Sequence, residues 1–282
     1  MEKRSQTLFN QRSLRLIDDS WRTEIFGQAY QAITSFALED AIATAVGKEK
    51  APMSLRFWVH DRTLVLGIPD ARLPYLQDGV EYVRSLGYHV LVRNSGGLAV
   101  LLDKQVLNVS LLVPSSHSLS IDEGYDTMFQ LVKEILEKEG VTIQAYEIIG
   151  SYCPGDYDLS IDGKKFAGLS QRRVREGISI QMYLDVAGNS YERAEIVRTF
   201  YNLAKKGQPT RFTYPEVNPS VMASLSQLLE RKVTVEEMKE AFLQALTRKG
   251  AQIQKGDYTE YERELFTQRM EQMEKRNEIL RF

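Results

Sequence analysis

The dipeptide Asp162-Gly163 is the feature that most restricts how this chain can fold. It is a signal for a two-residue β-hairpin turn. Apolar and polar residues alternate over 157–162, which is the period of a strand. The segment that begins at Lys164-Lys165-Phe166-Ala167 then forms the return strand. Two neighbouring antiparallel strands are therefore expected, and the second passes back along the start of the first.

The chain has one cysteine, Cys153, shortly before this hairpin. A single thiol can form neither an internal disulfide nor a zinc cluster of several thiolates, so it is either a small buried hydrophobe or a nucleophile. Gly150, Pro154 and Gly155 interrupt regular structure around it and predict a turn. Reactive groups are often presented on such loops. The local context therefore favours the nucleophile, and the buried thiol remains the alternative.

The return strand carries two lysines that are candidates for a cation beside the thiol. A cation there would favour the thiolate form of Cys153. Lys164 and Lys165 point to opposite faces of a strand, so only one of them can face Cys153. The spacing alone does not select between the two.

Composition bounds the class of protein. The chain has 282 residues, of which 43% are hydrophobic and 26% are charged, as in ordinary globular proteins. A net charge of -2 gives no reason to expect nucleic acid as a partner. No apolar run reaches membrane-spanning length, and the first residues lack the apolar core of a secretory signal. With a single cysteine, these features predict a cytoplasmic protein without a membrane partner.

The order of patterns predicts an α+β fold with mixed or antiparallel sheets and packed helices. A strand and a helix are expected in residues 15–47, where Glu39 and Asp40 are predicted to lie on a solvated helix face. Two adjacent strands are expected on either side of the turn at Asp61-Arg62. Another strand, over 141–149, would lead the chain to Cys153.

The character of the chain changes after Gly207. A linker is marked by three prolines, namely Pro209, Pro215 and Pro219. Helical patterns follow over 220–229, 234–246 and 258–280. We therefore expect a catalytic domain over residues 1–207 and a small helical C-terminal appendage over 208–282.

A glycine-rich segment, Arg93-Asn94-Ser95-Gly96-Gly97, follows a strand of the buried type at 88–92. Two glycines let the backbone approach a ligand closely, and their amides can point at an oxygen. Arg93 and Asn94 add hydrogen-bond donors. The segment predicts a loop that covers an acyl or carbonyl group. The alternative is a glycine-rich hairpin into a strand at 98–102.

The histidines offer a rival mechanism, a papain-like thiol hydrolase that pairs Cys153 with His60, His89 or His117. Such an enzyme requires a histidine within hydrogen-bond reach of the thiol. His60 ends a predicted strand, where a structural role is favoured, and no local motif places any of the three beside Cys153.

Three motifs in this order carry a resemblance to a known family. The glycine-rich loop, Gly150-Ser151-Tyr152-Cys153-Pro154-Gly155 and Gly163-Lys164-Lys165-Phe166-Ala167-Gly168 together resemble the lipoate/biotin protein ligase superfamily. Within it, the chain is most similar to the cysteine-dependent octanoyltransferases that use the glycine cleavage system H protein. The resemblance runs from about residue 15 through the helical tail and implies a biotin/lipoate ligase-like catalytic domain.

The resemblance also implies roles for residues. It places Lys165 at the acyl carbonyl as a catalytic residue with Cys153, so that Lys164 faces away. It makes the loop and hairpin substrate-binding through Arg93, Asn94, Ser95, Gly96, Gly97, Ala167 and Gly168.

Two departures from the commoner ligase pattern favour a thioester route over adenylate formation. The loop lacks the second arginine of many relatives, and ATP-using lipoate ligases have no nucleophilic cysteine at the position of Cys153. The implied reaction moves octanoyl from the H protein to lipoyl domains of 2-oxoacid dehydrogenase complexes, with no cofactor and no metal. The alternatives are octanoyl-acyl carrier protein as donor, an ATP-dependent lipoate-protein ligase, and a non-catalytic lipoyl-domain binding protein.

Overall fold

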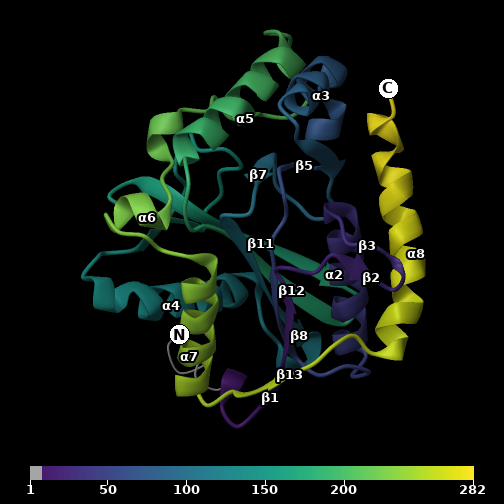
Figure 1. The fold of residues 1–282 in the computed structure, drawn as a ribbon, viewed down its shortest axis with the longest axis vertical. Helices are drawn as coiled ribbons and strands as arrows, with labels where there is room; N and C mark the ends of the chain where they lie inside the picture. The colour runs from purple at the N-terminus through teal and green to yellow at the C-terminus, as the bar shows by residue number, and fades with distance from the viewer. Residues whose placement is uncertain (1–7) are drawn as a thin grey trace.

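Eight strands form a mixed sheet at the centre of the computed structural model, which describes residues 8–282 (Figure 1). The α+β class with mixed sheets is therefore confirmed. Neighbouring strands at one end of the sheet are parallel, and from β4 onward every pair is antiparallel. The order is β13 (Gln252–Lys255), β1 (Ser13–Asp19), β4 (Ser54–Trp58), β8 (Val106–Pro114), β12 (Gly177–Asp185), β11 (Lys164–Val174), β10 (Asp158–Ile161) and β9 (Gln144–Ala145).

Helices cover both faces of this sheet. Successive side chains of a strand point to opposite faces, and both faces of the sheet carry apolar residues that must be buried. On β8, Val109 and Leu111 face one core and Leu112 faces the other. The first core is covered by α4 (Ile121–Leu136) and α7 (Val235–Arg248), and the second by α2 (Ala32–Gly47). Figure 1 shows α8 (Glu260–Asn277) running alongside α2. None of the helices in residues 8–282 is both long and apolar enough to cross a lipid bilayer.

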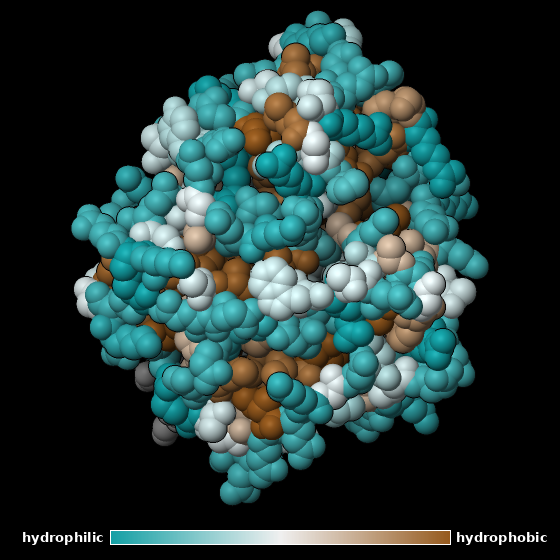
Figure 2. Space-filling model, viewed as in Figure 1, coloured by the Kyte–Doolittle hydropathy of each residue, from teal (hydrophilic) through white to brown (hydrophobic). Residues whose placement is uncertain are grey.

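A second, three-stranded sheet stands beside α2, in the order β6 (His89–Val92), β5 (Thr63–Leu66), β7 (Val100–Leu102). It is covered by α3 (Leu76–Ser85) and α5 (Ser190–Lys205), and a short hairpin of β2 (Glu24–Ile25) and β3 (Gln28–Ala29) lies near α2 and α8 (Figure 1). The glycine-rich segment is not a hairpin, because β5 lies between β6 and β7. On the face seen in Figure 2 most of the surface is hydrophilic, and apolar residues show in separate patches.

The two strands expected on either side of Asp61-Arg62 exist, but they are not adjacent. β4 belongs to the large sheet and β5 to the small one. β4 already pairs with β1 on one edge and with β8 on the other, so it has no free edge for β5. The segment at Asp61-Arg62 therefore carries the chain between sheets.

The hairpin at Asp162-Gly163 is confirmed. β10 and β11 are antiparallel, and both turn residues have positive φ values, +50° and +74°, as a two-residue turn of the primed type requires. The strand expected over 141–149 is reduced to β9, a two-residue edge strand.

The prediction of a solvated face for Glu39 and Asp40 is wrong. Glu39 is buried and accepts hydrogen bonds from Arg56 Nη1 at 2.8 Å and Ser179 Oγ at 2.5 Å. Asp40 is buried and accepts two hydrogen bonds from Arg172, at 2.6 and 2.8 Å. The reason is that α2 lies between the large sheet and α8, so its charged residues are covered by neighbours that pair with them.

The C-terminal segment has the expected helices, with the short α6 (Leu225–Leu228) first, and also β13, which the sequence patterns did not indicate. β13 pairs in parallel with β1. Phe242 of α7 packs on Phe57 of β4 with ring centroids 6.2 Å apart. Arg15 of β1 and Glu262 of α8 form a buried ion pair at 2.5 Å. The proposed boundary at residue 207 is thus crossed by sheet pairing and by a shared core.

Candidate active site

Cys153 lies on the loop between β9 and β10 in a left-handed backbone conformation, with φ of +47°. This conformation costs a non-glycine residue on the order of 1–3 kcal/mol and is concentrated at functional sites. The loop is held by Asn218, whose amide donates to the Gly150 carbonyl at 2.7 Å. Two donors reach the thiol. The Leu98 amide lies 3.1 Å from Sγ and Arg93 Nη2 lies 3.5 Å from it.

The glycine-rich loop brings these donors to Cys153. Arg93 follows β6, and its Nη2 also donates to the Leu98 carbonyl at 2.9 Å. Gly97 has φ of +93°, and a Cβ built there would lie 2.4 Å from Arg93 Nη2 and 2.9 Å from Cys153 Sγ. Only glycine therefore fits at 97. Gly96 has no other atom within 4 Å of the corresponding Cβ position.

Lys165 is the lysine whose side chain faces the Cys153 loop, and Lys164 is exposed. Lys165 Nζ donates to the Cys153 carbonyl at 2.8 Å, to the Tyr152 carbonyl at 3.0 Å and to Ser151 Oγ at 3.2 Å. The ammonium thus binds the main chain of the Cys153 loop, while the hydrogen bonds to Sγ come from the glycine-rich loop.

A carboxylate balances this buried ammonium. Asp158 Oδ1 lies 2.8 Å from Lys165 Nζ, and both side chains are buried. Asp158 Oδ2 accepts from the Ile148 amide at 3.2 Å and from Ser151 Oγ at 3.3 Å. Burial raises the pKa of the Asp158 carboxyl, and the neighbouring Lys165 ammonium opposes that rise. The pair ties the hairpin to both ends of the loop.

A cavity of about 250 Å³ opens beside Cys153. Its mouth is formed by partly exposed residues, including Tyr125, Gly155 and Gln171. Its other end is buried and mainly apolar, lined by Phe36, Trp58, Val65, Val100 and Leu102. A polar mouth with a free thiol and an apolar interior suits a short aliphatic chain bearing a carbonyl group.

The structure brings some of the predicted substrate-binding residues to the cavity and leaves others outside. Its lining includes Arg93, Gly96, Gly97 and Gly168. The predicted residues Asn94, Ser95 and Ala167 are buried and are not part of the lining. Asn94 Nδ2 donates to the Phe36 carbonyl at 3.2 Å and so anchors the loop to α2.

Several residues at the site were missed by sequence reasoning, namely Leu98, Asp158, Tyr183 and the apolar end of the cavity. Tyr183 of β12 limits the space at Gly168, where a Cβ would lie 2.8 Å from its ring. Asp158 was recognised only as a polar member of an alternating strand. Leu98 acts through its backbone amide, for which side-chain identity gives no signal.

A polar network behind the glycine-rich loop was also missed. Asp70 accepts hydrogen bonds from the Gly67 amide at 2.7 Å and from the Tyr201 hydroxyl at 2.9 Å. The same hydroxyl accepts from the Ala99 amide at 3.1 Å. Burial raises the pKa of Asp70 to about 6. This network fixes the chain immediately after Leu98.

No histidine in the described residues 8–282 is a hydrogen-bond partner of the Cys153 thiol. His60 and His89 line a different, larger cavity, and His117 contacts Arg12. Burial, with a smaller effect of the Arg56 charge, lowers the pKa of His60 to about 3. The contacts of a papain-like pair are therefore absent from this part of the chain.

Comparison with solved structures defines the class of fold. The chain superposes with a TM-score of 0.66 on a putative lipoate protein ligase of T. acidophilum with bound lipoic acid. That match covers 93% of this chain and 95% of the other at 18% identity. A lipoate-protein ligase A bound with ATP gives a TM-score of 0.67, also at 18% identity, covering 93% and 94% of the two chains. At this identity the likeness establishes the fold alone.

Sequence comparison then identifies the family. Residues 31–247 match the lipoyl protein ligase A/B catalytic domain, and the chain belongs to this family. An octanoyl-[GcvH]:protein N-octanoyltransferase of Oceanobacillus iheyensis is 48% identical, over 98% of this chain and 99% of that protein. A lipoyl-[GcvH]:protein N-lipoyltransferase of Listeria monocytogenes is 41% identical, over 96% and 97%.

Proposed function

We propose that this protein is an N-octanoyltransferase. It takes an octanoyl group from a lysine of the glycine cleavage system H protein, GcvH, and transfers it to the lysine of lipoyl domains of 2-oxoacid dehydrogenase complexes. The observation that carries the proposal is the Cys153 thiol, which meets two hydrogen-bond donors at the mouth of an apolar cavity. The near full-length similarity to the Oceanobacillus octanoyltransferase supports this donor and this acyl group.

In the first step, the Cys153 thiolate attacks the octanoyl carbonyl carbon of the donor amide. A carbon–sulfur bond forms, the carbon–nitrogen bond breaks, and the departing lysine amine gains a proton. The Leu98 amide and the Arg93 guanidinium would favour the thiolate, because both donate toward Sγ. The octanoyl chain lies in the apolar cavity, where exclusion of water limits hydrolysis of the thioester.

In the second step, the ε-amine of the acceptor lysine attacks the thioester. A carbon–nitrogen bond forms, the carbon–sulfur bond breaks, and the amine loses a proton as the thiolate is regenerated. One exchange of amide for amide is thus split into two acyl transfers. The bonds balance without any further reactant.

Lys165 is proposed to act in both steps as the cation beside the reacting groups and as a carrier of protons to and from the two amines. Its contacts with the Cys153 and Tyr152 carbonyls also hold the nucleophile's loop in place. Asn94, Ser95 and Ala167 are proposed to shape the acyl site from outside the cavity lining. A free thiol nucleophile requires reducing surroundings, and we propose the cytoplasm as its location.

The test is the intact mass of the protein after mixing with octanoylated GcvH, with Cys153→Ala as control. We expect one octanoyl adduct that hydroxylamine removes and that the variant lacks. An adduct from octanoyl-acyl carrier protein, but none from octanoyl-GcvH, would keep the chemistry and overturn the donor. Lipoylated GcvH is a necessary third donor, given the name of the Listeria relative. No adduct from any donor would overturn the nucleophile.

A further inference from the structure

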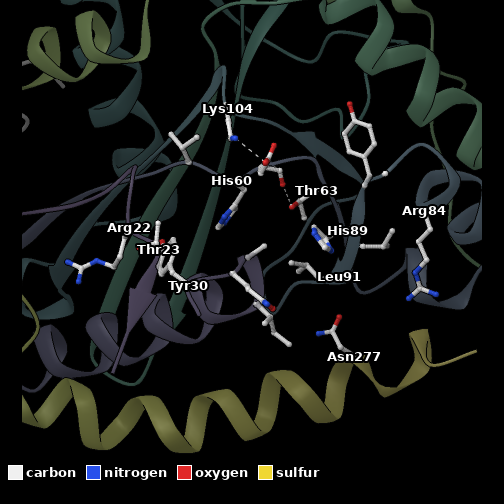
Figure 3. A pocket seen from close by; sticks show the side chains of 18 of the residues that line it. Arg22, Thr23, Tyr30, His60, Thr63, Arg84, His89, Leu91, Lys104 and Asn277 are labelled. Atoms are coloured by element: carbon white, nitrogen blue, oxygen red, sulfur yellow. Dashed lines mark hydrogen bonds and ion pairs between the residues drawn. The ribbon is translucent and has the colours of Figure 1, made fainter. Parts of the chain in front are cut away.

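Figure 3 shows a second cavity, which has a volume of about 990 Å³. Its lining includes His60, which follows β4, Thr63 of β5, Lys104 and, from α8, Asn277. Figure 3 shows His60 near its centre, between Tyr30 and Thr63, with α8 along one side. We call the cavity beside Cys153 the inner cavity and this one the outer cavity.

Four segments contribute one residue to each cavity, which places the two cavities next to one another along these segments. The contributing residues are two apart at the end of β4, within β5 and at the end of β7, and four apart on α2. Within β5 and α2 this spacing places both residues of a pair on one face of the element. In each pair the inner residue is given first: Trp58 and His60, Val65 and Thr63, Leu102 and Lys104, Phe36 and Ala32. The register agrees, since Thr63 pairs with Leu102 where the cavities meet.

Trp58 stands at this junction and is held from several sides. It packs edge-to-face on Phe36, with centroids 5.4 Å apart, and on His60 at 5.1 Å. Its indole Nε1 donates to Ser110 Oγ at 3.1 Å, and it is 3% exposed. A side chain with a fixed hydrogen bond and close neighbours does not move aside without losing these contacts.

The inner and outer cavities differ in volume, and this difference affects which acyl chains can bind. The inner cavity, at about 250 Å³, lies below the roughly 300–1,000 Å³ usual for small-molecule sites. The outer cavity, at about 990 Å³, lies at the top of that range. An acyl chain bound to Cys153 runs from the mouth toward the buried end and meets Trp58. Trp58 lines the inner cavity and packs on His60 of the outer cavity, so it lies between the two spaces.

We infer that Trp58 is the end wall of the acyl cavity and sets the longest acyl chain that Cys153 accepts. This inference rests on the proposed function. Attraction alone discriminates weakly between chain lengths, because an added methylene increases apolar binding instead of opposing it. A rigid wall rejects the longer chain by steric overlap. The acyl group of the substrate is therefore limited to about the length of octanoyl, and the outer cavity stays closed to it.

The experiment compares octanoyl-GcvH with dodecanoyl-GcvH as donors and measures the initial rate of Cys153 acylation by intact mass. The wild-type protein is expected to prefer octanoyl by about 100-fold, within the range that pocket size can produce. In Trp58→Ala the ratio is expected to fall at least about tenfold, because the longer chain enters the outer cavity. Ile33→Ala is the matched control, since Ile33 lines the outer cavity alone and the ratio should not change.

If circular dichroism and a melting curve show that Trp58→Ala does not fold, a second variant tests the inference. Trp58→Phe keeps an aromatic ring but shortens the wall, and it should raise acylation by decanoyl-GcvH relative to octanoyl-GcvH. An unchanged preference in every folded Trp58 variant, with normal octanoylation of the wild type, would overturn the inference alone. Absence of octanoylation in the wild type would overturn the proposed function itself.

Discussion

The main-chain amide of Leu98 donates a hydrogen bond of 3.1 Å to Sγ of Cys153, although 55 residues separate the two. The donor belongs to the glycine-rich loop and the acceptor to the loop before the β10–β11 hairpin. The direction of this donor is set by the backbone conformation of the loop and not by a side-chain rotamer. The conformation of the glycine-rich loop therefore determines where this donor lies relative to the Cys153 sulfur.

Gly97→Ala is expected to slow acylation of Cys153 by about 100-fold or more, a loss of the size seen when one oxyanion-hole donor is removed. The added methyl group would overlap Arg93 Nη2 and crowd the thiol, and φ is +93° at this position. Intact-mass kinetics with octanoyl-GcvH give the measurement. Circular dichroism and a melting curve check that the variant folds, and acylation of the folded variant at the wild-type rate would contradict the explanation.

The ion pair of Lys165 and Asp158 predicts strong coupling between two substitutions. Lys165→Met leaves a buried carboxylate without its cation, and Asp158→Asn leaves a buried ammonium without its anion. Each should lower the free energy of unfolding by about 3–5 kcal/mol. The double variant removes both charges and should lose clearly less than the sum. Urea unfolding of the four proteins measures this coupling.

The wild type, the two single variants and the double variant also distinguish a structural role of Lys165 from a role in the reaction. If the lysine acts on the reacting groups, as proposed, the double variant regains stability but remains slow in acylation. Acylation that recovers together with stability would mean that Lys165 serves only to hold the loop.

Asp70 predicts a dependence of stability on pH. Its folded-state pKa is about 6, above the ordinary 3.8, so the folded protein binds more protons between these values. Its contribution to the free energy of unfolding is therefore largest below pH 3.8 and is lost as pH rises through 6. At about 1.36 kcal/mol for a tenfold change in proton affinity, the loss amounts to about 3 kcal/mol.

The measurement is urea unfolding of the wild type and of Asp70→Asn at several pH values from 4 to 7. Asparagine does not titrate, so only the wild type loses stability through position 70. The free energy of unfolding of the wild type should therefore fall relative to that of Asp70→Asn as pH rises. Asp185, whose pKa burial also raises to about 6, is present in both proteins and cancels. A difference that does not vary with pH would show that Asp70 is not the group responsible.

The buried pair of Arg15 and Glu262 links β1 to α8, with side chains 7% and 0% exposed. Glu262→Gln should destabilise the whole protein by about 3–5 kcal/mol, because the arginine charge is left buried without its partner. Glu260→Gln, at an exposed position of the same helix turn, should change stability by less than about 0.5 kcal/mol. Loss of α8 alone, with the rest unfolding at its normal midpoint, would instead support an independent appendage.

Sequence patterns predicted the parts of the fold that depend on neighbours along the chain. The hairpin at Asp162-Gly163 needs only its turn residues and the alternation beside it, and it is present. β13 was missed because four largely exposed residues become a strand only through pairing with β1. Glu39 looked solvated because its partner Arg56 lies on a strand, and no local pattern joins the two.

The candidate site divides in the same way. Cys153, Lys165 and the glycine-rich loop carry recognisable side chains or glycines, so motifs find them. The Leu98 amide, the Asp70–Tyr201 network and the Trp58 wall form where segments distant in the sequence meet. No local sequence pattern predicts them. The lysine that spacing left undecided is oriented by the pleat of β11, which buries Lys165 and exposes Lys164.

The pairing of Arg15 with a residue 247 positions later has a consequence for synthesis of the protein on the ribosome. At roughly 5–20 residues per second, translation takes on the order of 10–50 s to cover that distance. During this time the outer edge of β1 in the nascent chain is not paired with β13. An unpaired strand edge is a template for pairing with other chains. Newly made copies are therefore most exposed to aggregation, and most in need of a chaperone, before β13 leaves the exit tunnel.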